Sequence, residues 1–405
     1  MSAAQAAEQA AEQAARGAYG RLVALLAART GDVAAAEDAL SDAFQSALRH
    51  WPGTGVPDRP EAWLLTVARR RLGHARRHRG VADGARVALE WLATPDSPVE
   101  LPDRRLQLML VCAHSAIAAE ARAPLMLQTV LGLDAARIAS CYLASPAAMA
   151  QRLVRAKARI RTAGIPFELP GPEALPTRLS SVLEGIYGAY GTGWADVSGA
   201  DAAVRGLAEE AIWLARVVVA LSPEPEARGL LAMMLHAEAR RPARRSGDGA
   251  YVPLSQQDTA LWSRPLMAEA EALLREAARA GTLGRFQLEA AIQSFHISAR
   301  LTGQRADGAL LALYDALADI APTAGVLVAR AAALAEAGHP AAARTALDAL
   351  GPELAQHQPW WATRARVMAL LGDASGAREA ARRAAALTED PAVRAFLLAG
   401  LFQPA

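Results

Sequence analysis

The chain has 405 residues, a formal net charge of +2 at pH 7 and a hydrophobic fraction of 53%. A chain of this length can build two or more domains with buried cores. Because the net charge is close to zero, the electrostatic field of the whole molecule would not attract nucleic acid. Binding of nucleic acid would therefore depend on local basic patches. Alanine, leucine and arginine favour helix and few β-branched runs occur, so we predict an all-α fold.

Two cysteines, Cys112 and Cys141, are too few for a disulfide framework or a zinc site. Cys112 and His114 have no second pair of ligand-type residues nearby, so we expect packed or surface side chains and no metal. Residues 1–16 lack the basic start and apolar core of a signal peptide. No apolar run of about 18 residues is free of charge, so we expect a cytoplasmic protein without membrane contact.

Helical periodicity predicts a first domain at residues 1–90. Its first helix begins at Leu22, its second covers 32–51, and its third covers 61–79 after Pro60 in the first turn. The third helix carries an aromatic residue and several arginines that could contact DNA: Trp63, Arg69, Arg70, Arg71, Arg76 and Arg77. Arginine patches bind phosphates by counterion release, but a solvated face of an arginine-rich protein looks the same. The pattern leaves both interpretations open.

A linker at 91–103 precedes a second domain at 104–167, which ends in a helix-turn-helix pattern. Ser145 can cap the second helix of the pair, and Pro146 suits its first position. Its apolar stripe consists of Met149, Leu153, Ala156 and Ile160. Its candidate DNA-contacting residues are Gln151, Arg152, Arg155, Lys157 and Arg159. This pattern suits a helix whose N-terminus enters the major groove, although helix pairs of this kind also serve as plain packing units.

The rest of the chain predicts a helical domain at 174–301 and helical repeats at 308–402. Two small residues recur there at an offset of 34 residues, which is the tetratricopeptide (TPR) period: Gly338 and Ala343, then Gly372 and Ala377. Small residues at these places allow two helices to pack closely. We therefore predict a TPR-like helical domain at the C-terminal end of the chain.

Several stretches resemble extracytoplasmic-function sigma factors. The stretches GDVAAAEDALSDAFQSALRHWP (31–52) and PEAWLLTVARRRLGHARR (60–77) resemble region 2. The stretches LQLMLVCAHSAIAAEARAPLMLQTVLGL (106–133) and ASPAAMAQRLVRAKARIRTAGIPF (144–167) resemble region 4. Four further stretches resemble the subgroup of these sigma factors that has a long TPR-like C-terminal extension. They are EAIWLARVV (210–218), GLLAMMLHAEARRPAR (229–244), QQDTALW (256–262) and FQLEAAIQSFH (286–296).

The resemblance implies a role in transcription initiation. The helix at 32–51 would bind the core of RNA polymerase, and its expected contacts are Asp38, Asp42 and Phe44. The helix at 61–79 would recognise the −10 element of promoter DNA, and the helix at 146–161 would read the −35 element. The polymerase performs the chemistry, so the resemblance implies no catalytic residue, no cofactor and no metal in this chain.

The chain departs from the subgroup at several positions. Residues 190–194 read YGTGW where an aromatic-Asn-Glu-Gly-aromatic segment is usual, Arg137 stands for a glutamate and Ala148 for a threonine. A reassigned scaffold is therefore an alternative: a small-molecule binder or a cofactor-independent enzyme of a biosynthetic pathway, or a structural adaptor. Its pocket would be lined by Tyr187, Tyr190, Trp194, His236, Gln257, Asp258, Trp262 and His296, which also suit purely structural roles. Phosphate-loop, Rossmann, HExxH and GxSxG motifs are absent.

Overall fold

The computed structural model describes residues 2–78, 103–141, 144–171, 173–195, 202–304 and 306–400. Within these ranges the backbone forms α-helices, short 3-10 helices and an isolated antiparallel bridge between Arg245 and Tyr251. The prediction of an all-α fold is confirmed. The chain divides into two compact units, Met1–Val217 and Val218–Ala405, which are called unit one and unit two and are described separately.

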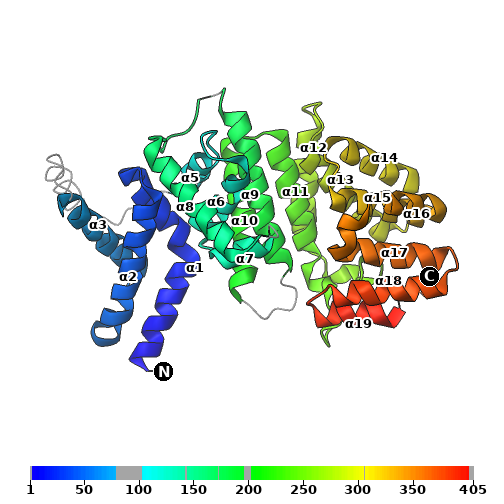
Figure 1. Ribbon diagram of the computed structural model, residues 1–405, viewed down its shortest axis with the longest axis horizontal. Helices are drawn as coiled ribbons and strands as arrows, with labels where there is room; N and C mark the ends of the chain where they lie inside the picture. Colours follow the sequence, from blue (N-terminus) through cyan, green and yellow to red (C-terminus); the bar gives the residue numbers. More distant parts are fainter. Residues whose placement is uncertain are drawn as a thin grey trace. The chain divides into compact units, whose positions relative to one another are not determined.

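Unit one consists of helices that pack side by side (Figure 1). They are α1 (Ala3–Thr30), α2 (Val33–Thr54), α3 (Pro60–His78), α5 (Arg105–Cys112), α6 (Ala119–Leu131), α7 (Ala135–Cys141), α8 (Pro146–Thr162), α9 (Leu175–Ala195) and α10 (Ala202–Leu221), whose last residues cross into unit two. The predicted domain at 174–301 is thus divided by the boundary between the units. One reason is that α9 packs against α6, as part of unit one.

The first helix is longer than the sequence pattern predicts, because α1 begins at Ala3 and not near Leu22. Ser2 caps it through a capping box with Gln5, in which each side chain accepts from the other residue's backbone N–H. Leucine periodicity does not reveal this part of the helix because its buried residues are alanines at helical spacing: Ala7, Ala11, Ala14 and Ala18.

A tight turn joins α1 to α2. Gly31 ends α1 in the left-handed conformation, with φ of 67°, and Asp32 caps α2 by accepting a hydrogen bond from Ala35 N at 3.1 Å. This confirms the predicted start of the second helix. The helix continues through Pro52 to Thr54, slightly beyond the predicted stop. The two helices pack closely on each other and both contact α3, so the three helices share one core.

Both helices of the predicted helix-turn-helix pattern are present as α7 and α8, and Tyr142 and Leu143 of the predicted turn lie outside the described residues. Ser145 accepts a hydrogen bond from Ala148 N at 3.2 Å at the start of α8, and Pro146 occupies the first helical position. All four residues of the predicted apolar stripe are buried: Met149, Leu153, Ala156 and Ile160. The stripe faces the protein because α8 packs against α7, α6 and α2.

Unit two begins with α11 (Pro225–Ala239) and ends with α19 (Pro391–Gly400) (Figure 1). Between them lie η1 (Arg241–Arg244), η2 (Leu254–Gln256), η3 (Thr259–Leu261), α12 (Arg264–Ala278), α13 (Arg285–Thr302), α14 (Asp307–Ile320), α15 (Ala324–Glu336), α16 (Pro340–Asp348), η4 (Pro352–Gln356), α17 (Gln358–Leu370) and α18 (Ala374–Ala386).

Two helix pairs of unit two repeat at the spacing that the sequence shows. Helix α17 begins at Gln358, 34 residues after α15 begins at Ala324. Gly338 and Gly372 lie between the helices of their pairs with φ of 87° and 82°, a conformation that favours glycine. The small residues that follow them, Ala343 and Ala377, are buried. Close packing of two helices is therefore the role of both alanines.

Candidate functional site

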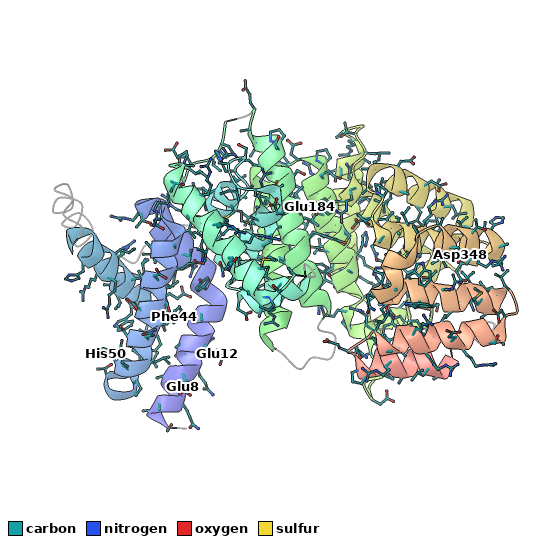
Figure 2. All side chains as sticks on the ribbon, viewed as in Figure 1. Glu8, Glu12, Phe44, His50, Glu184 and Asp348 are labelled. Atoms are coloured by element: carbon teal, nitrogen blue, oxygen red, sulfur yellow. The ribbon has the colours of Figure 1, made fainter. Side chains whose placement is uncertain are left out.

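One face of α2 is directed to solvent. Asp38 and Asp42, one helical turn apart, are exposed, and Phe44 is half-buried. The opposite face is anchored in the core through Ala36, Leu40, Ala43 and Ala47. Figure 2 labels Phe44 and His50 along this helix. The exposed face offers two carboxylates beside apolar surface, since Leu48 is also 45% exposed.

Helix α3 presents arginines beside a packed tryptophan. Arg70 and Arg71 are exposed, whereas Arg69 is half-buried. Burial lowers the pKa of the Arg69 guanidinium, and the nearby charge of Arg29 lowers it further. The side chains of Arg76 and Arg77 lie outside the described residues.

Trp63 is fixed by another tryptophan. Its ring lies edge-on to Trp51 with 5.4 Å between ring centroids and an interplanar angle of 64°. Trp51 is buried and Trp63 half-buried, so the pair joins α2 to α3. Trp63 therefore has a packing role, and only part of its surface is open to a partner.

The first half of α8 carries side chains that are free to contact a partner. Gln151 and Arg155 are exposed and Arg152 is half-buried. In the part of the chain that the structure describes, neither Arg152 nor Arg155 is held by an ion pair. These three side chains lie on the exposed side of α8, together with Ala147, Ala148 and Val154.

The second half of α8 is different, because its cations are used within the protein. Lys157 Nζ lies 2.7 Å from Glu37 Oε2 on α2, and both side chains are mostly buried. Arg161 lies 3.4 Å from Asp32. Arg159 Nε donates to the backbone oxygen of Ala116 at 3.4 Å. Lys157 thus differs from the expected phosphate contact: in this structure its ammonium is neutralised by a carboxylate.

Glu37 and its partners were not found by sequence reasoning. Glu37 and Lys157 are 120 residues apart in sequence, so helical periodicity gives no signal that they meet. Only the residue type offers a hint, because Lys157 is the single lysine of an arginine-rich chain.

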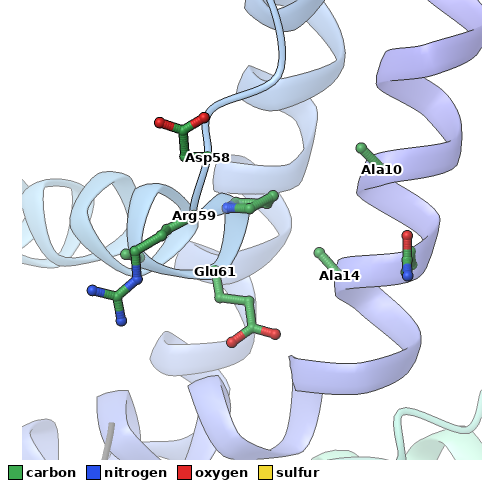
Figure 3. A pocket seen from close by; sticks show the side chains of 8 residues that line it. Ala10, Ala14, Asp58, Arg59 and Glu61 are labelled. Carbon is green, nitrogen blue, oxygen red and sulfur yellow. The ribbon is translucent and has the colours of Figure 1, made fainter. Parts of the chain in front are cut away.

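A cavity of about 400 Å³ lies between the first half of α1 and the start of α3 (Figure 3). Asp58, Arg59 and Glu61 line one side, opposite Ala10 and Ala14. Glu61 also pairs with Arg21 on α1. The lining combines opposite charges and has no nucleophile beside a base.

The residues of the alternative pocket are divided between the two units. Tyr187 and Tyr190 lie on α9 in unit one, while the Trp194 side chain lies outside the described residues. The others belong to unit two: His236, Gln257, Asp258, Trp262 and His296. Neither unit therefore contains all eight residues of the predicted pocket.

The unit-two members of this set have structural surroundings. Asp258 is exposed and caps η3 by accepting from Ala260 N at 2.9 Å. Trp262 is buried in a small cluster with Ala243 and Ile297. The Gln257 side-chain amide donates a hydrogen bond to the backbone oxygen of Val252 at 3.3 Å.

Two histidines complete the set. His236 is completely buried, 3.5 Å from Glu271 Oε1, and burial lowers its pKa to about 4. His296 is half-buried, with its ring 6.2 Å from that of Phe295.

Among the described residues, no group of three or more His, Cys, Asp or Glu side chains could hold a metal ion. Cys112 is buried beside Thr129 at 3.6 Å, and burial raises the pKa of its thiol to about 12. His114 accepts a hydrogen bond from Ala116 N at 3.0 Å. In the same part of the chain, no helix is long and apolar enough to cross a membrane.

Comparison with known proteins places this geometry in a family. Residues 16–81 match sigma-70 region 2; this range covers the second half of α1 and all of α2 and α3. Residues 178–278 match a family of unknown function, DUF6596. Uncharacterized protein R00370 of Rhizobium meliloti (strain 1021) is 36% identical over 380 residues, which cover 89% of this chain and 88% of that protein. No solved structure matches the chain significantly.

These matches support one of the two interpretations of the sequence. A sigma-70 region 2 domain implies binding to the core of RNA polymerase and a sigma-factor-like role in transcription initiation. None of the matches supports the alternative of a scaffold reassigned to small-molecule binding or catalysis. The chain therefore belongs to the same family as R00370 and is a sigma-70-like protein with a region 2 domain at residues 16–81.

Proposed function

We propose that the protein is a sigma factor of the extracytoplasmic-function type, which acts in the cytoplasm and directs RNA polymerase to promoters. The observation that carries the proposal is the first half of α8: a capped helix start with Gln151, Arg152 and Arg155 unengaged, in a chain that also has a region 2 domain. A helix of this kind reads DNA when its N-terminal residues enter the major groove.

In this proposal α8 reads the −35 element. Arg152 and Arg155 bind phosphates or guanine edges, and Gln151 is available to an adenine edge. Ala147 and Ala148 at the helix start are exposed and offer only methyl contacts. Sequence readout would therefore depend on few side chains, and phosphate contacts would supply much of the affinity.

Helix α3 would recognise the −10 element. Arg70 and Arg71 are exposed on it and follow the half-buried Trp63 by about two turns. Basic side chains on one helix can follow a DNA backbone, and an aromatic ring beside them can stack on an unpaired base. Arg76 and Arg77 extend the basic sequence towards the end of the helix.

The exposed face of α2 would bind the core of RNA polymerase. Asp38 and Asp42 supply negative charge, while Phe44 and Leu48, four residues apart, supply apolar surface on a neighbouring flank of the helix. Charged groups at the rim of an interface govern the rate and selectivity of association, and buried apolar groups supply most of the affinity.

Unit two, with its paired helices, would be a TPR-like regulatory domain in this proposal. Repeats of helix pairs commonly form binding surfaces for other proteins. The proposed domain order is 1–90 (region 2), 91–103 (linker), 104–167 (region 4), 174–301 (helical) and 308–402 (TPR-like).

The test is a pull-down of the purified full-length protein with core RNA polymerase of its own organism, followed by run-off transcription on a genomic promoter library. The expected result is stable association and a defined set of transcripts. A variant with Asp38→Ala and Asp42→Ala should lose association at least about tenfold, by roughly 1.4 kcal/mol.

The matched control is Glu224→Ala with Asp319→Ala, which removes the same charge from an exposed residue just before α11 and an exposed residue of α14. The control should associate like the unchanged protein. Absence of association in every version would refute the proposed function.

A further inference from the structure

Basic side chains from two helices meet at the loop that joins α5 to α6. Arg122 Nε, near the start of α6, donates a hydrogen bond to the backbone oxygen of Ile117 at 3.0 Å. Arg159 Nε, in the second half of α8, donates a hydrogen bond to the backbone oxygen of Ala116 at 3.4 Å. Because these two carbonyl groups belong to consecutive residues, the loop brings the two guanidinium groups close together.

Helix α9 adds a third arginine. Arg122 Nη1 lies 3.5 Å from Ser181 Oγ on α9, and Arg178 precedes Ser181 by about one turn on the same face of that helix. His114 in the loop senses the same charges: burial lowers its pKa, and the charges of Arg178 and Arg122 lower it further. The three residues Arg122, Arg159 and Arg178 are called the arginine cluster.

The charges of the arginine cluster are not neutralised within the protein. In the part of the chain that the structure describes, no member of the cluster forms an ion pair, and the Arg178 guanidinium has no hydrogen-bond partner. Arg122 and Arg159 bind only neutral oxygen atoms, so they keep their full charge and have further N–H groups to donate. By contrast, Arg105 and Lys157 are both paired with carboxylates.

The arginine cluster is open to a large partner. Arg159 is exposed, and Arg122 and Arg178 are half-buried. Cations that are held together repel one another, and a bound anion removes this repulsion. A planar guanidinium group suits phosphate, which it can bind through two parallel hydrogen bonds.

The cluster continues the surface that is proposed to bind DNA. Arg159 follows Arg155 by one turn of α8, so the two side chains lie on the same side of the helix. From α8 the path to Arg178 crosses two helix contacts, α8 with α6 and α6 with α9. Four residues of helix and two helix-to-helix spacings amount to at most about 26 Å, or roughly eight base pairs of duplex. A duplex that touches Arg155 therefore has phosphates within reach of the cluster.

We propose that the arginine cluster binds the phosphate backbone of promoter DNA beside the segment that α8 reads, with Arg178 contributing from α9. The inference rests on the proposed function, because it starts from the DNA contact proposed for α8. Residues 178–278 match the family of unknown function. The DNA-binding surface thus extends beyond the predicted region 4 domain at 104–167 into this segment. Since phosphate contacts fix the position of a protein on DNA, α9 helps to set the register of α8.

The experiment measures binding of the full-length protein to a labelled genomic promoter duplex by fluorescence anisotropy, from 50 to 200 mM salt. The decisive variant is Arg178→Gln, which removes the charge and keeps a polar side chain. Arg178→Lys keeps the charge but not the planar group. The matched control is Arg49→Gln, which removes the same charge from an exposed position of α2.

Arg178→Gln should reduce the slope of log K against log salt by about 0.9, the value for one lost phosphate contact. The ratio of parent to variant affinity should then fall about 3.5-fold between 50 and 200 mM salt. Arg178→Lys and Arg49→Gln should keep the slope of the parent. A purely structural role of Arg178 would not distinguish lysine from glutamine by charge. Equal slopes for Arg178→Gln and Arg49→Gln would overturn the inference.

Hydroxyl-radical footprinting locates the contact on the DNA. The α8 footprint is the set of positions that lose protection in Arg152→Ala with Arg155→Ala. Arg178→Gln should lose protection only at backbone positions outside this set and within roughly eight base pairs of it. If Arg178→Gln protects every position that the parent protects, the inference is wrong.

The outcomes separate this inference from the proposed function. If Arg152→Ala with Arg155→Ala lowers the salt slope and Arg178→Gln does not, the inference fails while the α8 contact stands. If Arg178→Gln lowers the slope but the protein does not associate with core RNA polymerase, the cluster is a DNA-binding surface and the proposed function fails. If the parent binds no duplex DNA, both fail. If Arg178→Gln weakens only the association with core RNA polymerase, the cluster binds that protein and the inference is overturned.

Discussion

Glu226 on α11 caps a different helix, because its carboxylate accepts a hydrogen bond from the backbone N–H of Phe286 in α13 at 3.0 Å. A second bond comes from Gln287 N at 3.1 Å. The first N–H groups of a helix have no partner within the helix, and a negative charge there is favoured by the helix dipole. Nearby, Gly229 lets the backbones meet: a Cβ on it would lie 2.6 Å from Gln287 N.

Glu226→Ala should therefore destabilise unit two by about 1–2 kcal/mol, the usual effect of losing a helix cap. Denaturant unfolding followed by circular dichroism measures the change. Glu224→Ala is the control, because Glu224 is exposed and its side chain caps nothing. Equal unfolding midpoints for the two variants would remove the capping role.

His236 makes the stability of unit two depend on pH. Burial lowers its pKa to about 4, although Glu271 nearby acts in the opposite direction. The unfolded chain therefore binds the proton first, near pH 6.5, whereas the folded protein keeps His236 neutral down to about pH 4. Its contribution to stability is complete above pH 6.5 and is lost as the pH falls towards 4, by up to roughly 3 kcal/mol.

Measuring the free energy of unfolding at pH 7 and pH 5 tests this. The difference between the two values should shrink in His236→Leu, which has no titrating ring at this position. His50→Gln, at an exposed position of α2, should leave the difference unchanged. A parent protein whose stability is the same at both values of pH would contradict the prediction.

Local sequence signals predicted much of this fold. Ser145, Pro146 and the stripe from Met149 to Ile160 predicted α8 correctly, because caps and helical periodicity are properties of neighbouring residues. The start of α1 was missed because Ala7 and its alanine neighbours have too little apolar contrast to reveal a buried face.

The candidate site was harder to predict than the helices. The sequence showed which side chains of α8 point away from its apolar stripe, but not that Lys157 meets Glu37. That contact depends on how two domains pack, which no local pattern encodes. For the same reason Gly20 and Gly17 look alike in the sequence, although only Gly20 touches another helix.

Arg105 joins α5 to α10 within unit one. Its guanidinium binds Asp103 and Glu210 and lies 3.9 Å from the centroid of the Trp213 ring. The side chain is only 10% exposed. Arg105→Met should lower the free energy of unfolding by about 1–3 kcal/mol, because it removes charged hydrogen bonds to Asp103 and Glu210, whose side chains are each 30% exposed.

The neighbouring Arg104 is exposed and supplies the control for this change. Arg104→Met removes the same charge and should alter the free energy of unfolding by less than about 0.5 kcal/mol. Both variants can be followed by thermal unfolding, and Trp213 fluorescence should change only in Arg105→Met. A comparable loss of stability in both variants would show that the contacts of Arg105 contribute little.

The last prediction concerns the salt dependence of DNA binding. Arg152 and Arg155 are unengaged on α8, so each is available for one phosphate contact. Changing both to alanine should weaken binding to duplex promoter DNA and reduce the slope of log K against log salt by about 2, since each lost contact removes about 0.9.

Arg378→Ala with Arg382→Ala is the control, because it removes the same charge from the exposed face of α18 and should leave the slope unchanged. Fluorescence anisotropy from 50 to 200 mM salt measures both slopes. An unchanged slope in the α8 variant would mean that this helix does not contact the DNA backbone, because both variants lose the same net charge and only the loss of a phosphate contact changes the slope.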